Sequence, residues 1–556
     1  MDLWLEDLEQ LAPPAPEDGL GLVCWAADHL RGKRRSGAPL SPVLRSERGP
    51  RVVFLSASDG TAPARLAVGA GRGMLAAVRQ AVARLPEGSQ PAWVKLDLVQ
   101  AAWPADRRPG SAAAGHCGVA FPRPLGVAFL PEEVMAARLL DEHGQLHPVR
   151  AAACWCRRTV AAQAPAFPSR PAQHFATRGY LWQDGQALRL ARGHRVVEEL
   201  TPESLLAAAR LGGEYLVRSA QPDGRFGYLY QPDTDTYAQD YNLVRHAGTS
   251  YALLELYQAT GEKALAQVAG RALDFLHTAV APCTLAGQRV LAIQEEGAVK
   301  LGGVALAALA LAKQAEATGE ERHLPLLGEL GRAMLLLQQP SGELVHKALP
   351  DGQPVDLRSD YYSGEALFAL ARMHALDGRP EWLEAAERGM DYLVRTQQES
   401  SDDELARYHW VLYALNELHR RRPRPHYLPH ALRIARALVG QQCRDPRRPG
   451  ALGSFGNLTS TTAAVSTEGL GAAYRLAHRC GEYQEAQTML AVIRLGVRFQ
   501  LQAQYLPELA MHLPRPQQAL GGFRHSAASG EVRIDYVQHE ISSLLSLAAI
   551  LASAAG

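Results

Sequence analysis

The feature that most constrains this chain is a phrase that repeats at a nearly fixed spacing in its C-terminal two-thirds. Each copy is an apolar segment followed by a glycine turn: ALLELYQATGE at Gly261, ALALAKQAEATGE at Gly319, ALFALARMHALDGR at Gly378 and GAAYRLAHRCGE at Gly481. The successive spacings are 58, 59 and 103 residues, and YALNELHRRRP near Arg421 fills the long interval. Such self-similarity indicates a repeat architecture, whose unit here is a polar loop, an apolar helix, a glycine turn and a second helix.

From residue 202 we expect helices to the end of the chain and no β-sheet. Thr201 followed by Pro202 is a typical helix start. Segments such as 304–312 (VALAALALA) are apolar on all sides and should be buried all round, whereas 382–397 is amphipathic and should face solvent on one side. The alternation predicts an inner ring of six helices inside an outer ring of six. The predicted helices are 202–219, 242–260, 263–278, 300–318, 322–338, 361–376, 380–397, 406–420, 426–442, 460–478, 483–502 and 537–553.

Over residues 202–556 this pattern resembles the (α/α)6 toroid of the six-hairpin glycosidase superfamily. The resemblance implies a mainly α fold of six helical hairpins. The same toroid also carries polysaccharide lyases, sugar epimerases, terpene cyclases and lanthionine-forming enzymes, so the fold does not define the chemistry. Cys283, Cys443 and Cys480 lack the adjacent histidine of the lanthionine-forming zinc site, and the Asp-rich and repeated Gln-Trp motifs of terpene cyclases are absent.

Residues 1–200 predict a smaller α+β domain of undefined role, which precedes the toroid at 201–556. Strand patterns cover 51–57 and 64–70 around a turn at Asp59, then 93–99, with weaker signals at 125–130, 147–154 and 179–190. Residues 74–85 have helical spacing. The glycines of 69–73 match neither the dinucleotide nor the Walker spacing, so we predict a plain turn there. The proline-rich run 165–171 is typical of an extended segment that lies against another surface, so we expect residues 51–190 to form a sheet-containing module that packs against the toroid and narrows its rim.

Composition and charge exclude several classes of protein. A formal net charge of +1 provides no general attraction for nucleic acid, and the basic run 31–35 is expected to be solvated. Seven cysteines in 556 residues do not form a disulfide scaffold, and Cys154 and Cys156 lack zinc-ligand spacing. The acidic start MDLWLEDLEQL is not a signal peptide, and 542–555 is too short for a membrane span. We therefore expect a cytoplasmic protein with no metal, cofactor, nucleic-acid or membrane partner, and with its oligomeric state left open.

Polar residues gather before each predicted inner helix, most densely in the stretch DYNLVRHAGT at 240–249. In an up-down ring, all inner helices run the same way, so their N-terminal ends meet on one face. Helix capping explains Thr459, Ser460 and some aspartates. It does not explain cations such as Arg245 and His246 in the first turn of a buried helix, because buried charges need partners. We therefore expect a site at this rim.

Two groups of residues are expected to line that site. The candidate catalytic residues are Asp240, His246, Asp360, His409, Asp535 and His539. The candidate substrate-binding residues are Tyr230, Tyr241, Asn242, Arg245, Glu296, Tyr361, Tyr362, Glu365, Trp410, Glu468, Arg524, Arg533 and Tyr536. Six helix N-termini and two arginines around one cavity favour an acidic sugar or another anionic small molecule.

Three reactions fit these residue types. Glycoside hydrolysis, our first expectation, needs two carboxylates that flank the scissile bond of an oligo- or polysaccharide. A polysaccharide lyase needs a Tyr or His base and a group that neutralises a uronate, and a sugar epimerase needs two bases on opposite faces of the sugar. A protein of another class is a further alternative: a non-catalytic toroid that serves as a binding or scaffold subunit of a biosynthetic complex.

Overall fold

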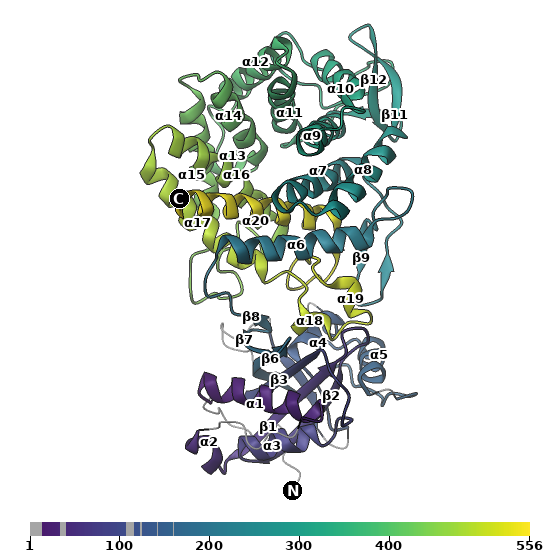
Figure 1. Ribbon diagram of the computed structural model, residues 1–556, viewed down its shortest axis with the longest axis vertical. Helices are drawn as coiled ribbons and strands as arrows, with labels where there is room; N and C mark the ends of the chain where they lie inside the picture. Colours follow the sequence, from purple (N-terminus) through teal and green to yellow (C-terminus); the bar gives the residue numbers. More distant parts are fainter. Residues whose placement is uncertain are drawn as a thin grey trace.

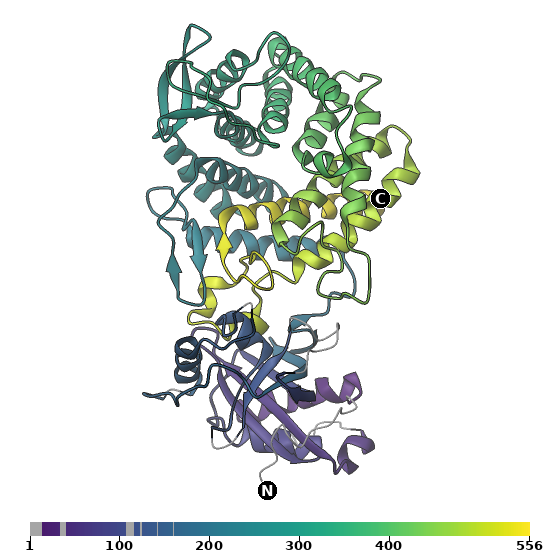
Figure 2. The same cartoon turned by 180° about the vertical axis from the view of Figure 1, so that it is seen from behind.

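The computed structural model describes residues 14–33, 41–106, 116–122, 125–141, 143–159 and 161–555. The chain forms an (α/α)6 toroid preceded by a smaller α+β domain, as predicted. Figures 1 and 2 show the two parts one above the other in both views, with the helices of the toroid around a common centre. The acidic start of the chain lies outside the described residues, as do positions 34–35 of the basic run.

Six inner helices close the ring. Each one packs on the next in chain order, and the last packs on the first, which excludes an open solenoid. They are α7 (Leu243–Thr260), α9 (Leu301–Thr318), α11 (Tyr362–Asp377), α14 (His409–Arg421), α16 (Ser460–Arg479) and α20 (Ile534–Ala555). Each is covered by an outer helix: α6 (Pro202–Ser219), α8 (Lys263–His277), α10 (Leu324–Leu336), α12 (Pro380–Thr396), α15 (Tyr427–Gln441) and α17 (Tyr483–Leu501). All twelve predicted helices are present.

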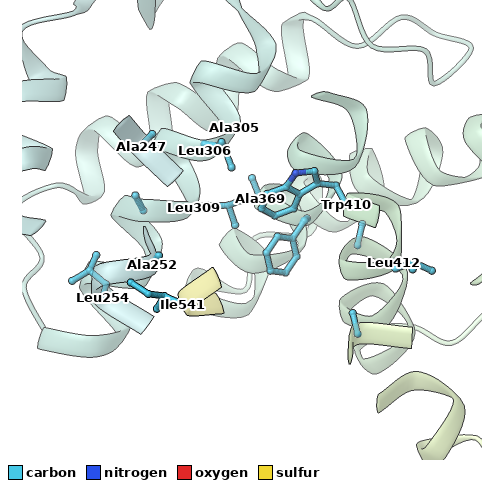
Figure 3. Close-up of a cluster of buried hydrophobic side chains, with 14 of the residues drawn as sticks. Ala247, Ala252, Leu254, Ala305, Leu306, Leu309, Ala369, Trp410, Leu412 and Ile541 are labelled. Carbon is cyan, nitrogen blue, oxygen red and sulfur yellow. The ribbon is translucent and has the colours of Figure 1, made fainter. Parts of the chain in front are cut away.

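The sequence repeat has a direct structural cause. Gly261, Gly319 and Gly378 each follow an inner helix and adopt left-handed φ values of 73, 74 and 73°, a conformation that glycine reaches at little cost. An inner helix such as α9 is apolar on all sides because it packs against its inner-ring neighbours and also against an outer helix. Every residue of 301–314 in α9 is buried. Figure 3 shows side chains of five inner helices, among them Leu254, Leu309 and Ile541, around this shared core.

The expectation that the toroid contains no β-sheet is wrong. Two small antiparallel sheets fold in the loops before inner helices, where they extend the rim without interrupting the ring. One comprises β9 (Leu229–Gln231), β10 (Thr236–Tyr237) and β15 (Val532–Arg533); the other comprises β11 (Val280–Leu285), β12 (Gln288–Glu295), β13 (Ala298–Lys300) and β14 (Lys347–Ala348). The β11–β12 hairpin turns at Ala286 and Gly287, both with positive φ, which is the two-residue turn that favours hairpins. Short helices α13 (Asp402–Leu405), α18 (Pro507–Ala510) and α19 (Pro516–Ala519) also lie in loops.

The N-terminal domain is built on an antiparallel sheet of strand order β2-β1-β3-β6-β4-β5 in the described residues, with β7 and β8 continuing from β6. Its strands are β1 (Pro50–Ser58), β2 (Arg65–Arg72), β3 (Trp93–Pro104), β4 (Gly118–Phe121), β5 (Val127–Phe129), β6 (Gln173–Gln183), β7 (Gln186–Ala191) and β8 (His194–Arg195). Its helices are α1 (Pro16–Leu30), α2 (Pro42–Ser46), α3 (Met74–Val82), α4 (Pro131–Ala136) and α5 (Pro148–Thr159). The strand expected at 147–154 is therefore wrong. Pro148 opens a helix there, which buries Ala151, Cys154 and Arg158 on one face.

Two further expectations concern loops of this domain. The plain turn expected at 69–73 is confirmed only at its last residue, because residues 69–72 continue strand β2. The chain turns at Gly73, which has φ 92°, and Glu47 accepts a hydrogen bond from the first N–H of α3 at Met74 (3.0 Å). The proline-rich run packs on its own domain: Phe167 contacts Phe121 and Phe129, because this apolar side chain completes a local core. The sheet-containing module does pack against the toroid, through other residues.

The loop between α17 and α20 holds the two parts together. Met511 is fully buried among Ala64, Trp93, Leu181 and Leu190 of the N-terminal domain. Beside it, Arg195 and Glu508 form an ion pair at 2.8 Å. This loop precedes α20, so the docked domain lies toward the face that carries the N-terminal ends of the inner helices.

Within the described residues, α20 is the one helix that is long and apolar enough to cross a membrane by length and composition. It is an inner helix that packs on α6, α7 and α16. Its apolar character is therefore explained by burial within the ring.

Candidate functional site

A cavity of about 380 Å³ lies where the N-terminal ends of the inner helices meet. All six inner helices, or the residues directly before them, contribute to its wall. The lining residues are Asn242, Val244, Arg245, Leu306, Ser359, Tyr361, Tyr362, Glu365, His409, Trp410, Thr461, Thr462, Val465, Arg533, Asp535, Gln538 and His539.

Ten predicted site residues lie in this wall: Asn242, Arg245, Tyr361, Tyr362, Glu365, His409, Trp410, Arg533, Asp535 and His539. Glu468 lies directly behind them, with its carboxylate 3.1 Å from Nδ1 of His539 and 3.2 Å from the hydroxyl of Tyr413. The ring geometry is thus what brings residues from four distant stretches of sequence together.

Glu365 is the most perturbed acid of the cavity wall. It is buried in the first turn of α11, and no described residue makes a hydrogen bond to its Oε2. Burial raises its pKa to about 8, although the nearby charge of His539 opposes the shift. Glu365 is therefore protonated at neutral pH and can donate a proton.

Two histidines face each other in the same cavity, with ring centroids 6.3 Å apart. Burial lowers the pKa of His409 to about 3, and the charge of His539 adds to the effect. Burial also opposes charge on His539, but the carboxylate of Glu468 outweighs it, and the pKa of His539 is raised. The pair therefore combines a neutral imidazole, whose Nε2 has no partner among the described residues, with an imidazole that favours the cationic form.

A charged cluster forms the opposite part of the wall. Asp535 accepts hydrogen bonds from Nε of Arg245 at 3.0 Å and from Nε of Arg533 at 2.6 Å. The guanidinium of Arg533 also stacks on the ring of Tyr536, 4.4 Å from its centroid. These contacts fix both arginines at the rim, and they explain how cations are stable beside helix N-termini, where the helix dipole disfavours them.

Close approach by a glycine shapes this wall. A Cβ on Gly302 of α9 would lie 2.4 Å from the ring of Tyr362 and 2.8 Å from Oε2 of Glu365. The neighbouring Gly303 has open space, since its nearest contacts would be at 3.9 Å. Gly302 is therefore needed for Tyr362 and Glu365 to take their places.

His246 and Tyr241, both predicted for this cavity, lie outside it. His246 points away from the axis toward α8, where Nε2 lies 2.8 Å from the carbonyl of Ala272 and Nδ1 lies 2.6 Å from the hydroxyl of Tyr241. Burial lowers its pKa to about 4. Tyr241 in turn accepts a hydrogen bond from the backbone N–H of Phe226. The two residues form a fully bonded link between α7 and the loop before it.

Asp240, Asp360 and Glu296 are also outside the cavity. Asp240 is exposed in the loop before α7. Asp360 faces a neighbouring groove of about 830 Å³ and lies 3.7 Å from Arg407. Glu296 is exposed in the turn between β12 and β13, where it pairs with Lys300. Asp360 and Glu296 thus make ion pairs at the surface, and none of the three carboxylates lines the axial cavity.

Tyr230, Tyr536 and Arg524 occupy other places. Tyr230 is fully buried in the β9–β10–β15 sheet and donates to Asp235. Tyr536 supports Arg533 from behind, and its hydroxyl donates to Glu531. Arg524 lies at the boundary with the N-terminal domain, 3.1 Å from Nε2 of His194. The predictions placed them by their position near the start of an inner helix. Tyr230 is instead held in β9, Tyr536 lies in α20 behind Arg533, and Arg524 faces the N-terminal domain.

Seven residues of the wall were not predicted as site residues, and two of them carry polar groups that bear on the chemistry. The seven are Val244, Leu306, Ser359, Thr461, Thr462, Val465 and Gln538. Gln538 could have been found, because it stands three residues after Asp535 and one before His539, on the same helix face. Thr461 carries a hydroxyl that is buried without a hydrogen-bond partner among the described residues. It follows directly after Thr459 and Ser460, which capping explains, and only the ring shows that it faces the cavity.

The described residues contain no group of three or more His, Cys, Asp and Glu that could hold a metal ion. The wall instead provides proton donors and acceptors, two guanidinium groups and three aromatic rings. Fold and cavity together define a toroid protein with an axial site suited to acid–base chemistry.

Among solved structures the chain is similar to three proteins, which are sugar enzymes by name. The GH76A alpha-1,6-mannanase from Salegentibacter sp. HEL1_6 is 11% identical, with 62% of this chain and 99% of that chain covered and a TM-score of 0.45. A D-mannose isomerase is 13% identical, with 63% and 97% covered and a TM-score of 0.46. A family 76 glycoside hydrolase from a bovine Bacteroides thetaiotaomicron strain is 9% identical, with 84% and 97% covered and a TM-score of 0.47. No protein-family profile and no curated protein matches the sequence.

Proposed function

We propose that the protein is a carbohydrate-active enzyme and that Glu365 is its general acid. The observation that carries this proposal is the protonated carboxyl in the cavity wall: burial raises the pKa of Glu365 to about 8. A carboxylic acid that keeps its proton at neutral pH can protonate a departing glycosidic oxygen. The rings of Tyr361, Tyr362 and Trp410 line the same cavity and offer flat surfaces on which a sugar can stack.

Glycoside hydrolysis is the first reaction that this arrangement supports. It requires a second carboxylate near the acid, and Asp535 is the other carboxylate in the wall. Arg245 and Arg533 hold Asp535 in place through both of its oxygens. Its role would be to stabilise the positive charge that develops on the sugar ring in the transition state.

A second reaction class is favoured by a separate observation, the unequal histidine pair. His409 is neutral with a free Nε2, and His539 favours the charged form 6.3 Å away. This is an arrangement of base and acid that can move a proton at a carbon next to a carbonyl or carboxylate. Epimerisation or lyase cleavage of a sugar is therefore the alternative to hydrolysis on the same cavity.

The charge of the wall bears on the substrate. Arg245, Arg533 and His539 in its cationic form outnumber Asp535 and Glu468 when Glu365 is protonated. The N-terminal ends of six inner helices add partial positive charge in the same direction. We infer that the preferred saccharide carries an acidic group, such as a uronate carboxylate.

The test is turnover of neutral and uronate-containing oligosaccharides by the full chain in D2O, followed by NMR. Hydrolysis creates a new reducing end without deuterium on carbon. Epimerisation or lyase cleavage passes through loss of a C–H proton, and a recovered or epimerised sugar then carries deuterium. Glu365→Gln should abolish hydrolysis while it preserves the fold. If the wild type binds saccharides but turns over none of the panel, the scaffold alternative replaces the enzyme.

A further inference from the structure

A second, smaller cavity lies between the N-terminal domain and the toroid, apart from the site described above. Its volume is about 70 Å³. One water occupies ~30 Å³ of the liquid, so this space holds about two waters or one small oxyanion. Two arginines line it, Arg192 from the N-terminal domain and Arg524 from the toroid, together with the imidazoles of His116 and His194. Burial and the charge of Arg524 lower the pKa of His194 well below its usual value, so this ring is neutral.

Arg524 is the buried cation of this cavity. It is only 3% exposed, and its Nη2 donates to the carbonyl of Gln502 at 2.9 Å and lies 3.1 Å from Nε2 of His194. Its Nε has no hydrogen-bond partner, and no carboxylate pairs with its guanidinium, among the residues that the structure describes. Burial lowers the pKa of Arg524, in keeping with this lack of a counter-ion. A buried guanidinium without a counter-ion is costly unless an anion occupies the adjoining space.

Arg192 reaches the same cavity from a strained turn. Arg192 and Gly193 form the two-residue connection between β7 and β8, with φ values of 53 and 76°. Turns of this kind favour Asn, Asp or Gly at the first position, so an arginine there costs free energy. Its Nη2 lies 2.9 Å from where a Cβ of Gly450 would be. The strained backbone thus presents a guanidinium to the cavity, across from Arg524.

The nearby carboxylate of Glu132 is only partly compensated. Glu132 lies 3.5 Å from Nε2 of His116, but Lys95 is 3.1 Å from the other oxygen of Glu132. Lys95 is itself fully buried and also pairs with Asp97. One lysine against two carboxylates leaves negative charge behind the cavity wall, so binding of an anion depends on the two arginines that line the cavity.

We propose that this cavity binds a free oxyanion of the size of phosphate or sulfate, held between Arg192 and Arg524. Such an ion would join the two parts of the chain. It would also reach the candidate active site, because the carbonyl of Arg524 accepts a hydrogen bond of 2.7 Å from the hydroxyl of Ser460. Thr461 and Thr462, the next residues of α16, line the axial cavity. The proposal does not depend on the proposed enzyme activity.

The experiment measures binding of inorganic phosphate to the full chain by calorimetry and by thermal unfolding, with chloride at equal ionic strength as the reference. Arg192→Asn removes one guanidinium and places a residue that the turn favours, so it should fold at least as well as the wild type. We expect it to raise the Kd for phosphate about tenfold or more, since charge-assisted hydrogen bonds are lost. Arg524→Met should abolish binding.

Two control variants define the site. Arg189→Asn removes an arginine from the same hairpin, where it faces Glu198 outside the cavity, and should leave the Kd unchanged. Arg533→Gln tests whether phosphate binds in the axial cavity instead. The proposal is overturned if phosphate does not bind to the wild type, if Arg192→Asn leaves its Kd unchanged, or if Arg533→Gln abolishes binding. A phosphate monoester such as glucose 6-phosphate serves as a further probe. If it binds more tightly than inorganic phosphate, the natural ligand is a phosphorylated molecule, and the proposal of a free ion is wrong.

Discussion

His409 and His539 face each other across the axial cavity with ring centroids 6.3 Å apart, and their pKa values are shifted in opposite directions. The difference comes from what lies behind each ring. His539 has the carboxylate of Glu468 at 3.1 Å, whereas His409 has no carboxylate among its contacts in the described part of the chain. Two chemically identical side chains thus become a base and an acid through their surroundings.

The first prediction concerns this pair. We expect an imidazolium signal for His539 at a pH where free histidine is already neutral, and a neutral signal for His409 down to about pH 3. His539 stabilises the fold below pH 6.5, and this contribution is lost as the pH rises through its folded pKa. For His409 the sign is reversed, and stability falls as the pH drops from 6.5 toward 3. NMR titration of the Hε1 protons checks the pKa values of both histidines, and the variants His409→Gln and His539→Gln assign the signals. Glu468→Gln should lower the pKa of His539.

The second prediction concerns Glu365→Gln. The folded pKa of about 8 exceeds the usual value of 4.5, so the unfolded chain loses its proton first and stability falls between these two pH values. The variant should match the wild type in stability below pH 4.5. It should be more stable at pH 8, by up to about 5 kcal/mol, since each pKa unit corresponds to ~1.36 kcal/mol. Urea unfolding at several pH values measures this difference. Equal pH dependence in the two proteins would show that Glu365 is already ionised in the fold.

The third prediction uses two adjacent glycines of α9. Gly302→Ala places a methyl group 2.4 Å from Tyr362 and 2.8 Å from Glu365, so it should displace both and destabilise the fold by about 1–3 kcal/mol. Gly303→Ala meets nothing closer than 3.9 Å and should stabilise the helix by about 0.5–1 kcal/mol. Thermal unfolding and saccharide turnover are measured for both variants. If both variants lose turnover to the same extent, the contact with Glu365 is not the reason.

The fourth prediction concerns the contact between the two parts of the chain. Met511 is fully buried among Ala64, Trp93, Leu181 and Leu190, so Met511→Ala should cost about 2–5 kcal/mol. Because the contact joins both parts, calorimetry should resolve two unfolding transitions in the variant where the wild type shows a more cooperative one. Met489→Ala, a buried methionine of α17 within the toroid core, is the matched control and should destabilise the toroid without uncoupling the parts.

The helices were predictable because their signals are local. Apolar periodicity, proline starts and glycine turns lie within each repeat, and they define the twelve helices in order. The small sheets at the rim were not predicted. β14 and β15 are two-residue strands whose partners, β13 and β9, lie in other loops, so no local pattern marks them. The β11–β12 hairpin is local, but its turn was missed. The burial of Lys95 and Asp97 was also not predictable from the sequence. The two residues alternate with apolar ones along β3 and so form a polar face of the strand. This face is buried only because α4 and the docked α18 loop cover it.

By itself, the sequence determined that polar and titratable residues would gather where the inner helices begin. Only the tertiary structure decided which of them face the axis. Arg245 and His246 are adjacent in the first turn of α7, yet a helix rotates by about 100° per residue. Arg245 therefore lines the cavity, while His246 turns to the carbonyl of Ala272 in α8. His409 begins α14 and faces the cavity, because the direction of a side chain is set by the rotation of its helix in the closed ring.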